Sequence, residues 1–384
     1  MNSRSLVDHF ASLPDPRIDR TKRHKLLDIV AIAICGMICG ANDWVAIEEY
    51  GQAKESWLRQ FLELVNGIPS HDTFGDVFSR LDSTAFQRCF MEWVQAVFTA
   101  TQGQVIAFDG KCPRGSKDGT LGRKAIDMVS AWATQNQLVL GQVKVNDKSN
   151  EITAIPALLA LLDVSGCIVT IDAIGCQKDI AQAIVDGQAD YVLALKENHP
   201  VLHQEVSTLF QTTAPLAQQA YTPDHTRTVE KDHGRLEIRE CWTLSDPQGF
   251  PFLHEAAAWP RLQTLVMLRR ERRFPDHTSV ETAFYLSSLA GSAARHLDVT
   301  RAHWGIENRL HWVLDIAFRE DDQRFRTKNG PQNATILRHM ALNLLKQETT
   351  VKGGIQTRRL RAGWDNAYLL KVLAGSRKSL PSSV

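Results

Sequence analysis

The fold is decided by three short stretches, Gln104-Val-Ile-Ala-Phe-Asp109, Asp127-Met-Val-Ser-Ala-Trp-Ala-Thr134 and Leu138-Val-Leu-Gly-Gln-Val-Lys-Val145. Each is largely apolar and contains β-branched or aromatic residues, a composition typical of strands. Gln135-Asn136-Gln137 separates the second stretch from the third and predicts the turn of a hairpin. The three stretches therefore predict three strands, of which the last two pair with each other.

Helical and extended patterns alternate after this hairpin. Residues 151–162 and 177–186 carry apolar side chains at helical spacing, whereas residues 167–172 and 191–196 are short apolar runs. The order strand–strand–strand–helix–strand–helix–strand is typical of parallel strands that are joined by helical crossovers beside a hairpin. The predicted fold class is therefore α/β, with a mixed five-stranded sheet and helices on both faces.

The segments on either side of this sheet have different patterns. Residues 25–62 are helical in pattern with a break at 40–42, and residues 70–81 and 83–98 each begin at or after a serine that can cap a helix. These two shorter helices fit a DNA-binding helix-turn-helix and fit an ordinary αα-hairpin as well. Residues 205–290 are rich in proline and in alternating strand patterns, which predicts a β-rich insertion.

A long helix is predicted at residues 299–318, after the insertion. The chain is thereby divided into five predicted segments. They are a helical N-terminal domain expected to bind DNA (1–102), the first part of a core (103–204), the β-rich insertion (205–295), the last part of the core with the long helix (296–345) and a basic C-terminal tail (346–384).

Charge is balanced over the whole chain but not along it. The 384 residues contain 44 Lys and Arg against 43 Asp and Glu, whereas residues 324–384 contain 12 basic residues and two acidic ones. Such a basic segment is typical of proteins with a polyanionic partner, because each Lys or Arg that neutralises a phosphate releases counterions. It is also typical of an ordinary solvated surface, and charge alone does not separate the two.

Cysteine usage and hydropathy limit the class of protein. The seven cysteines include no CxxC pair, which argues against a disulfide framework or a thiolate zinc site and favours a reducing cytoplasm. The most apolar run, residues 29–41, is too short to span a bilayer, and the first residues do not resemble a signal peptide. The sequence also lacks a P-loop, a GxSxG elbow and a strand-linked GxGxxG motif. We therefore expect a cytoplasmic protein without a membrane partner.

Two acidic residues end predicted strands. Asp109 ends the first strand and Asp172 ends the strand at 167–172, and these two strands are expected to be neighbours. Ligands in open α/β sheets bind beyond the carboxyl ends of the strands, where both acids lie. Adjacent carboxylates repel each other unless a cation lies between them, and Mg²⁺ or Mn²⁺ suits oxygen ligands. The alternative for either aspartate alone is a turn or helix cap.

Glu307 is the candidate third ligand of a two-metal site, in which paired ions hold the attacking and leaving oxygens of a phosphodiester. Helical spacing predicts that His303, Glu307 and His311 share one face of the long helix. Asp315 and the acidic cluster at 320–322 compete with Glu307 for this role. A zinc site made by the two histidines and Glu307 is a further alternative, although the spacing is not that of HExxH.

The chain resembles the DDE transposases of bacterial insertion sequences, and most closely the H-repeat-associated family. The matching segments spread over residues 6–345, and although each is short, the ordered set is specific. They are Leu13-Pro-Asp-Pro-Arg17 with Arg23-His24, Asp109-Gly-Lys111, Asp172-Ala-Ile-Gly-Cys-Gln177, Tyr191-Val-Leu-Ala-Leu-Lys-Glu-Asn198, His233-Gly-Arg235, His303-Trp-Gly-Ile-Glu-Asn308 and Leu310-His-Trp312.

The resemblance implies an RNase H-like core with a metal-binding and catalytic triad of Asp109, Asp172 and Glu307, and with the β-rich insertion between the last two acids. The implied cofactor is Mg²⁺, for which Mn²⁺ substitutes. The implied partners are double-stranded DNA, as terminal inverted repeats and as target, and further copies of the chain in a homodimer or higher multimer. The implied reaction is hydrolysis at the element ends, followed by joining of the freed 3′-hydroxyl to target DNA.

Several basic and polar residues near the acids are candidates for contacts with the DNA backbone. The broader insertion-sequence group often carries a Lys or Arg seven positions after the glutamate, where this chain has Leu314. Two other functions stay open: a catalytically inactive, transposase-derived DNA-binding or regulatory protein, and a nuclease without strand transfer. The candidate DNA-binding residues are Lys111, Lys196, Arg301, His303, Asn308 and Arg309.

Overall fold

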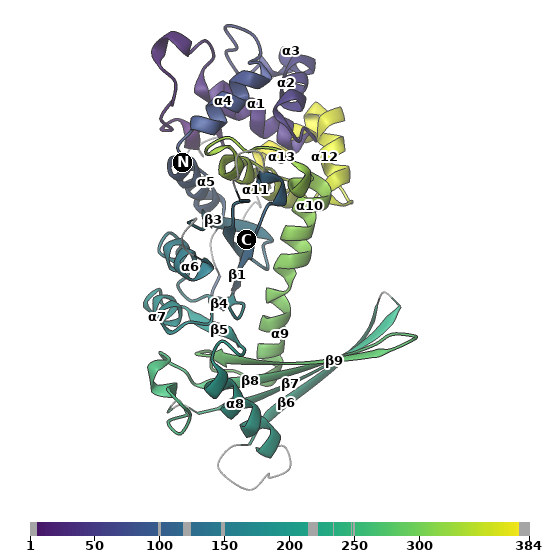
Figure 1. Ribbon diagram of the computed structural model, residues 1–384. Helices are drawn as coiled ribbons and strands as arrows, with labels where there is room; N and C mark the ends of the chain where they lie inside the picture. The colour runs from purple at the N-terminus through teal and green to yellow at the C-terminus, as the bar shows by residue number, and fades with distance from the viewer. Residues whose placement is uncertain are drawn as a thin grey trace, which may run out of the picture.

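The computed structural model describes residues 6–98, 101–117, 124–146, 150–213, 222–232, 234–246, 248 and 250–375. The described part is built on one nine-stranded sheet in the order β3-β2-β1-β4-β5-β9-β8-β7-β6, with a helical region at one end (Figure 1). The predicted α/β class is confirmed, but the five predicted strands are only part of the sheet. His233 and residues 376–384 of the expected tail lie outside the described residues.

The five predicted strands occupy one half of the sheet. β1 pairs with β2 and β2 with β3 antiparallel, whereas β1 pairs with β4 and β4 with β5 parallel. Gln137 has a φ of 56°, a left-handed conformation that closes the β2–β3 turn. The hairpin and the contact between the first and fourth strands are therefore confirmed. The strands are β1 (Val105–Lys111), β2 (Met128–Ala133), β3 (Leu138–Lys144), β4 (Ile168–Ile171) and β5 (Asp190–Leu195).

The insertion extends this sheet, which is why the sheet is not five-stranded. Each of its first three strands pairs antiparallel with the next strand along the chain. β9 also pairs antiparallel with β5, where Leu286 lies opposite Leu193. Only the last part of β9 is buried, so its apolar residues cover the edge that β5 would otherwise expose. The far ends of these strands form a twisted ribbon that projects from the molecule (Figure 1). The strands are β6 (Asp224–Asp232), β7 (Arg235–Ser245), β8 (Thr264–Arg273) and β9 (Thr278–Ser287).

Helices cover both faces of the sheet. α6 (Glu151–Leu159) and α7 (Lys178–Asp186) contact each other and lie on one side, while α9 (Ala293–His303) contacts β1 and β4 from the other (Figure 1). α8 (Pro200–Thr213) contacts β9. Beyond α9 the chain forms a π-helical turn at Glu307–His311 and then α10 (Trp312–Phe318). The predicted long helix therefore begins earlier than expected and is interrupted by a wider turn.

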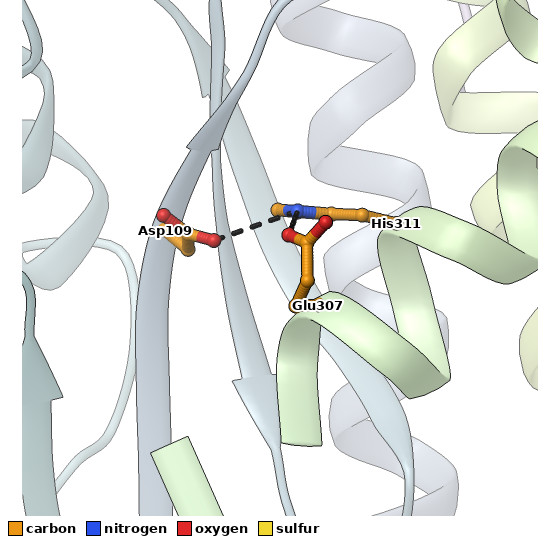
Figure 2. A group of neighbouring side chains, drawn as sticks. All are labelled: Asp109, Glu307 and His311. Atoms are coloured by element: carbon orange, nitrogen blue, oxygen red, sulfur yellow. Dashed lines mark hydrogen bonds and ion pairs between the residues drawn. The ribbon is translucent and has the colours of Figure 1, made fainter. Parts of the chain in front are cut away.

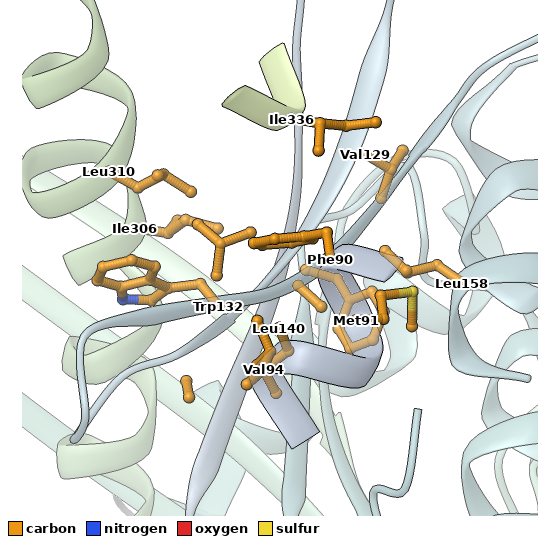
Figure 3. Packing of buried hydrophobic residues seen from close by; sticks show 14 of the residues in the cluster. Phe90, Met91, Val94, Val129, Trp132, Leu140, Leu158, Ile306, Leu310 and Ile336 are labelled. Carbon is orange, nitrogen blue, oxygen red and sulfur yellow. The ribbon is translucent and has the colours of Figure 1, made fainter. Parts of the chain in front are cut away.

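Buried side chains attach this interrupted helix to the sheet. Figure 3 shows Ile306 and Leu310 beside Trp132 of β2, with Met91 and Leu158 on the other side of the cluster. All five are buried. Because a fully buried large apolar side chain contributes about 1.5–3 kcal/mol, these contacts hold the helix in one position on the sheet.

Helices from both chain ends make up the region at the top of Figure 1. Ser70 caps α4 as predicted, accepting from the Thr73 amide, whereas α5 is capped by Asp82 and not by Ser83. Arg359 of α12 is buried and donates to the carbonyl oxygen of Met37, so part of the expected C-terminal tail is folded onto α1. The helices are α1 (Leu26–Ile38), α2 (Trp44–Ala53), α3 (Glu55–Leu58), α4 (His71–Arg80), α5 (Ser83–Val97), α11 (Gly330–Gln347), α12 (Ile355–Trp364) and α13 (Asn366–Ala374). No helix within the described ranges is long and apolar enough to cross a membrane.

Candidate metal centre

Two of the predicted acids lie side by side, but only Asp172 follows the end of its strand. β1 continues to Lys111, and Asp109 pairs with Ser130 of β2 within the sheet. The parallel register of β1 and β4 places Phe108 opposite Ile171, and the next residues along the two strands are Asp109 and Asp172. Asp109 accepts a hydrogen bond from the Gly110 amide at 2.9 Å, and Asp172 accepts one from the Gly175 amide at 3.5 Å. The neighbouring strands thus fix both carboxylates at the same edge of the sheet.

The π-helical turn brings a third acid to this edge. Figure 2 shows Glu307 and His311 facing Asp109 across the gap between helix and strand. His311 Nδ1 lies 3.2 Å from Glu307 Oε2 and 3.4 Å from Asp109 Oδ2. One ligand atom from each of the three residues lies within 4.8 Å of the other two. Side chains that are about 200 positions apart in the sequence are therefore close enough to share an ion.

The raised pKa of Asp109 indicates that the negative charge of the neighbouring acids is not balanced at this carboxylate. Burial, then the Asp172 carboxylate and to a smaller extent Glu307, raise the pKa of Asp109 to about 7, against the hydrogen bond from Gly110. A carboxyl group whose ionisation is opposed by its neighbours is the arrangement that a divalent cation relieves. The residues therefore fit a hard divalent ion.

A cavity of about 750 Å³ joins the three predicted acids to the insertion. Asp109, Asp172 and Glu307 all line it, although Asp172 is not among the described residues whose ligand atoms lie within 4.8 Å of one another. The remaining wall comes from β4, β5, β7, β8, β9, α8 and α9 and carries both signs of charge, with Glu197 and Glu281 beside the basic residues. Arg301 pairs with Glu230 at 2.8 Å. The basic residues that line it are Lys196, Arg239, Arg270 and Arg301.

Lys111 was predicted to contact DNA, but its side chain is paired with acids within the protein. Its side chain is 13% exposed, and its ammonium group lies 2.6 Å from Asp315 and 3.1 Å from Glu320. It also donates to the carbonyl oxygen of His311 at 3.1 Å. Lys111 therefore ties β1 to the helix that carries Glu307, and the two competing acids, Asp315 and Glu320, serve as its partners.

His303 is separated from the other two residues of the predicted zinc alternative. Its Nδ1 lies 3.0 Å from the Thr170 hydroxyl, and burial lowers its pKa to about 4. The imidazole is therefore neutral at neutral pH and hydrogen-bonded to β4. Glu307 and His311 stay together on one face as predicted, whereas His303 is not among the residues whose ligand atoms cluster there.

The pKa of His303 predicts acid sensitivity. Between pH 6.5 and 4 the unfolded imidazole binds a proton that the folded one does not, so stability is lost as the pH falls through this window. Urea unfolding over that window is expected to show a slope of at most about 1.4 kcal/mol per pH unit from this group. His303→Gln should reduce the slope, and His277→Gln, at an exposed histidine, should not. An unchanged slope in His303→Gln would contradict the assignment.

One acidic residue near the centre was missed from the sequence. The Glu151 carboxylate, in the first turn of α6, occupies the space that a β-carbon on Gly110 would need. Burial, and then Asp172, raise the pKa of Glu151. The only sequence signal is the glycine directly after Asp109, which permits this close approach. Glu151 adds a fourth negative group to the same edge.

The last two candidates, Asn308 and Arg309, are exposed on the π-helical turn and are not among the residues that line the cavity. The Arg309 carbonyl oxygen accepts a hydrogen bond from Lys346 at 2.8 Å. Together with the bond from Lys111 to the His311 carbonyl, this contact satisfies a second main-chain oxygen of the turn. The helix bearing Glu307 is thus held by two lysines from opposite sides of the fold.

Comparison with known proteins identifies the family. A family model described as "DDE_Tnp_1-associated" matches residues 7–94, and one described as "Transposase DDE domain" matches residues 79–344. YncI of Escherichia coli O157:H7 is 40% identical over 97% of this chain and 95% of its own length. YhhI of Escherichia coli K12, named H repeat-associated, is 37% identical over 98% and 99%, and both relatives carry the word transposase in their names.

Among solved structures, a piggyBac transposase synaptic complex with hairpin DNA aligns with a TM-score of 0.42 and 11% identity, covering 96% of this chain and 77% of that one. The family model covers well over half of this chain, and both relatives align over nearly their whole length. The predicted resemblance is thereby confirmed, and the chain belongs to the DDE transposase family.

Proposed function

We propose that this protein is the transposase of an insertion sequence. It would bind double-stranded DNA at terminal inverted repeats, cleave at the element ends and join the freed 3′-hydroxyl ends to target DNA. The observation that carries the proposal is the meeting of Asp109, Asp172 and Glu307 in one cavity, where burial and neighbouring acids raise the pKa of Asp109 to about 7. Membership of the DDE transposase family supports the same reaction class.

The three acids are the residues that would hold Mg²⁺, with Mn²⁺ as a substitute. Mixed parallel and antiparallel strands carry two of them, and a helix on one face of the sheet carries the third, which supports an RNase H-like core for residues 103–204 and 296–345. When bound, paired ions lower the pKa of the attacking water or hydroxyl and stabilise the leaving 3′-oxygen. The chain itself supplies the placement, through the β1–β4 register and the contacts of Lys111 with α10.

Basic residues in the wall of the cavity favour the binding of a DNA backbone next to the acids. Lys196 and Arg301 line that wall, and Asn308 and Arg309 lie exposed beside Glu307, so these four form the proposed DNA-contacting set. Lys111 and His303 are left out because they are engaged within the protein and not exposed, whereas Arg301 is exposed although it pairs with Glu230. The helical region at 1–102 and a multimer of the chain would bind the inverted repeats, on DNA in the bacterial cytoplasm.

Lys196→Ala is expected to weaken DNA binding. Each phosphate contact contributes about 0.9 to the slope of log affinity against log salt, so this variant should lower the slope by about 1. Fluorescence anisotropy with a duplex carrying one element end, measured over a series of salt concentrations, gives both values. Lys352→Ala, an exposed lysine in the α11–α12 connection, is the matched control. Equal slopes for Lys196→Ala and wild type would remove Lys196 from the set.

The full reaction is tested with purified protein, Mg²⁺, a linear duplex carrying the inverted repeat that flanks the gene, and a supercoiled plasmid as target. The proposal predicts cleavage at the repeat and products in which its 3′ end is joined to the plasmid. Cleavage without joined products would indicate a nuclease, and repeat-specific binding without cleavage would indicate a regulatory protein. Either result would overturn the proposed function.

A further inference from the structure

His311 occupies a position between two acids that the proposed reaction does not explain. Its side chain is 6% exposed, and its Nδ1 faces carboxylate oxygens of both Asp109 and Glu307 (Figure 2). It comes from the same π-helical turn as Glu307, four residues later. A buried imidazole nitrogen therefore lies where two proposed metal ligands converge.

The distances from His311 Nδ1 to the two carboxylate oxygens can be compared with those expected for hydrogen bonds and for ligands of one ion. A hydrogen bond from nitrogen to oxygen is usually 2.7–3.2 Å long, so the 3.2 Å contact with Glu307 is at the limit and the 3.4 Å contact with Asp109 exceeds it. Two ligands that each lie about 2.1 Å from one ion are about 3.0 Å apart at an octahedral angle and about 3.4 Å apart at a tetrahedral one. The 3.2 Å contact is a hydrogen bond in the absence of an ion and the 3.4 Å contact is too long for one, whereas both separations fall in the range expected for two ligands of a shared ion.

We propose that Nδ1 of His311 is a ligand of the ion held by Asp109 and Glu307. This inference rests on the proposed function, because it concerns one of the two metal positions that the reaction uses. That position has mixed nitrogen and oxygen coordination, whereas the position between Asp109 and Asp172 has oxygen ligands.

Neighbouring groups hold the ring in the orientation that ligation needs. Lys111 donates to the main-chain oxygen of His311, which fixes the residue within the turn. Ligation at Nδ1 puts the ring proton on Nε2, which is buried and has no hydrogen-bond partner among the described residues. Nδ1 of His339 on α11 is likewise buried and without one, and the two rings interact electrostatically. Metal-binding histidines donate their second ring proton to an acceptor, and His339 Nδ1 is a buried acceptor that no described residue occupies.

A nitrogen ligand changes which ions the position favours. Imidazole suits Zn²⁺, Fe²⁺ and Ni²⁺, whereas Mn²⁺ and Mg²⁺ prefer oxygen donors and Mg²⁺ is especially reluctant to lose its water. Mn²⁺ is therefore used as the paramagnetic probe of this position, and Ni²⁺ and Zn²⁺ should gain most affinity from the imidazole. Loss of the imidazole should weaken Mn²⁺ binding by roughly tenfold or more.

Pulsed electron paramagnetic resonance of the full chain loaded with Mn²⁺ tests the ligand directly. A coordinated ¹⁴N nucleus modulates the Mn²⁺ echo, and protein labelled with ¹⁵N-histidine should show the corresponding change in frequency. His311→Gln should lose the nitrogen modulation and bind Mn²⁺ more weakly. His303→Gln, which removes a buried histidine without carboxylate contacts in the described structure, should keep the modulation.

Failure of the His311 assignment can be distinguished from failure of the proposed function. Wild-type protein that binds Mn²⁺ without nitrogen modulation would overturn the assignment of His311 and leave the proposed transposase function in place. A modulation that persists in His311→Gln would also overturn it. Wild-type protein that binds no Mn²⁺ in titration calorimetry would overturn both the ligand assignment and the metal-dependent function. Absence of the ¹⁵N effect in wild-type protein overturns the assignment even where a variant fails to fold, and His311→Gln assigns a positive signal to one of the 13 histidines.

Discussion

Asp109→Asn is expected to abolish DNA cleavage and, at the same time, to stabilise the metal-free protein. Loss of a central metal ligand removes several kcal/mol of transition-state stabilisation, which corresponds to a rate loss of about a thousandfold or more. The gain in stability has a separate cause. The folded pKa of about 7 lies above the ordinary value of 3.8, so wild type loses stability as the pH rises through this window, and asparagine carries no such charge.

Two measurements on the same preparations check this prediction. Cleavage of an end-containing duplex with Mg²⁺ gives the rate, and thermal unfolding without metal above pH 7 gives the stability. Asp186→Asn, at an exposed acid at the end of α7, is the control and should match wild type in both. An Asp109→Asn protein that cleaves DNA at the wild-type rate would contradict the assignment of this residue. A lower melting temperature without metal would contradict the electrostatic reasoning.

Glu320→Gln is expected to destabilise the fold by about 3–5 kcal/mol, because it leaves buried cations without their counter-ion. The Glu320 side chain is 1% exposed and lies 3.0 Å from Arg338 and 3.1 Å from Lys111. Burial acts to raise the pKa of Glu320, but Arg338 and Lys111 outweigh it and hold the pKa at about 2. The network joins β1, α11 and the segment after α10, so its loss should loosen the helix that carries Glu307.

Asp322→Asn is the matched control for this variant. Asp322 lies two residues later and pairs with Arg319 on the surface, where both side chains are 66% exposed, so its loss should cost about 0–1 kcal/mol. Urea unfolding measures both variants. Because the pKa of Glu320 is lowered in the fold, its contribution is present above pH 4.5 and is lost as the pH falls towards 2. Equal stability of Glu320→Gln and Asp322→Asn would contradict a stabilising role for the network.

Local sequence patterns were sufficient to predict β1 to β5, the half of the sheet that carries the two aspartates. The turn at 135–137, the apolar strands and the helices between them are short-range signals, and the pairing of β1 with β4 follows from crossover connections. Both acids could be chosen because each follows an apolar run, although only Asp172 lies at the end of its strand and β1 extends two residues beyond Asp109. Whether these acids bind metal stays a prediction.

Long-range contacts account for what the sequence did not show. The pairing of β9 with β5 joins residues about 90 positions apart, and no local pattern indicates which edge the insertion will cover. Lys111 was expected to contact the DNA backbone because it is a basic residue beside Asp109, but it pairs with Asp315 and Glu320, which lie about 200 positions away in the sequence. The π-helical turn carries both Glu307 and His311, and no local sequence pattern indicated that His311 would lie 3.4 Å from Asp109.

A crystal of the full chain soaked in Mn²⁺, with data collected at the manganese absorption edge, tests the metal centre most directly. Anomalous peaks should appear in the cavity, coordinated by the carboxylates of Asp109, Asp172 and Glu307, and the Asp109→Asn protein under the same soak should lack them. A wild-type map with no manganese peak beside Asp109, or with manganese bound only elsewhere on the surface, would show that these acids do not form a metal centre.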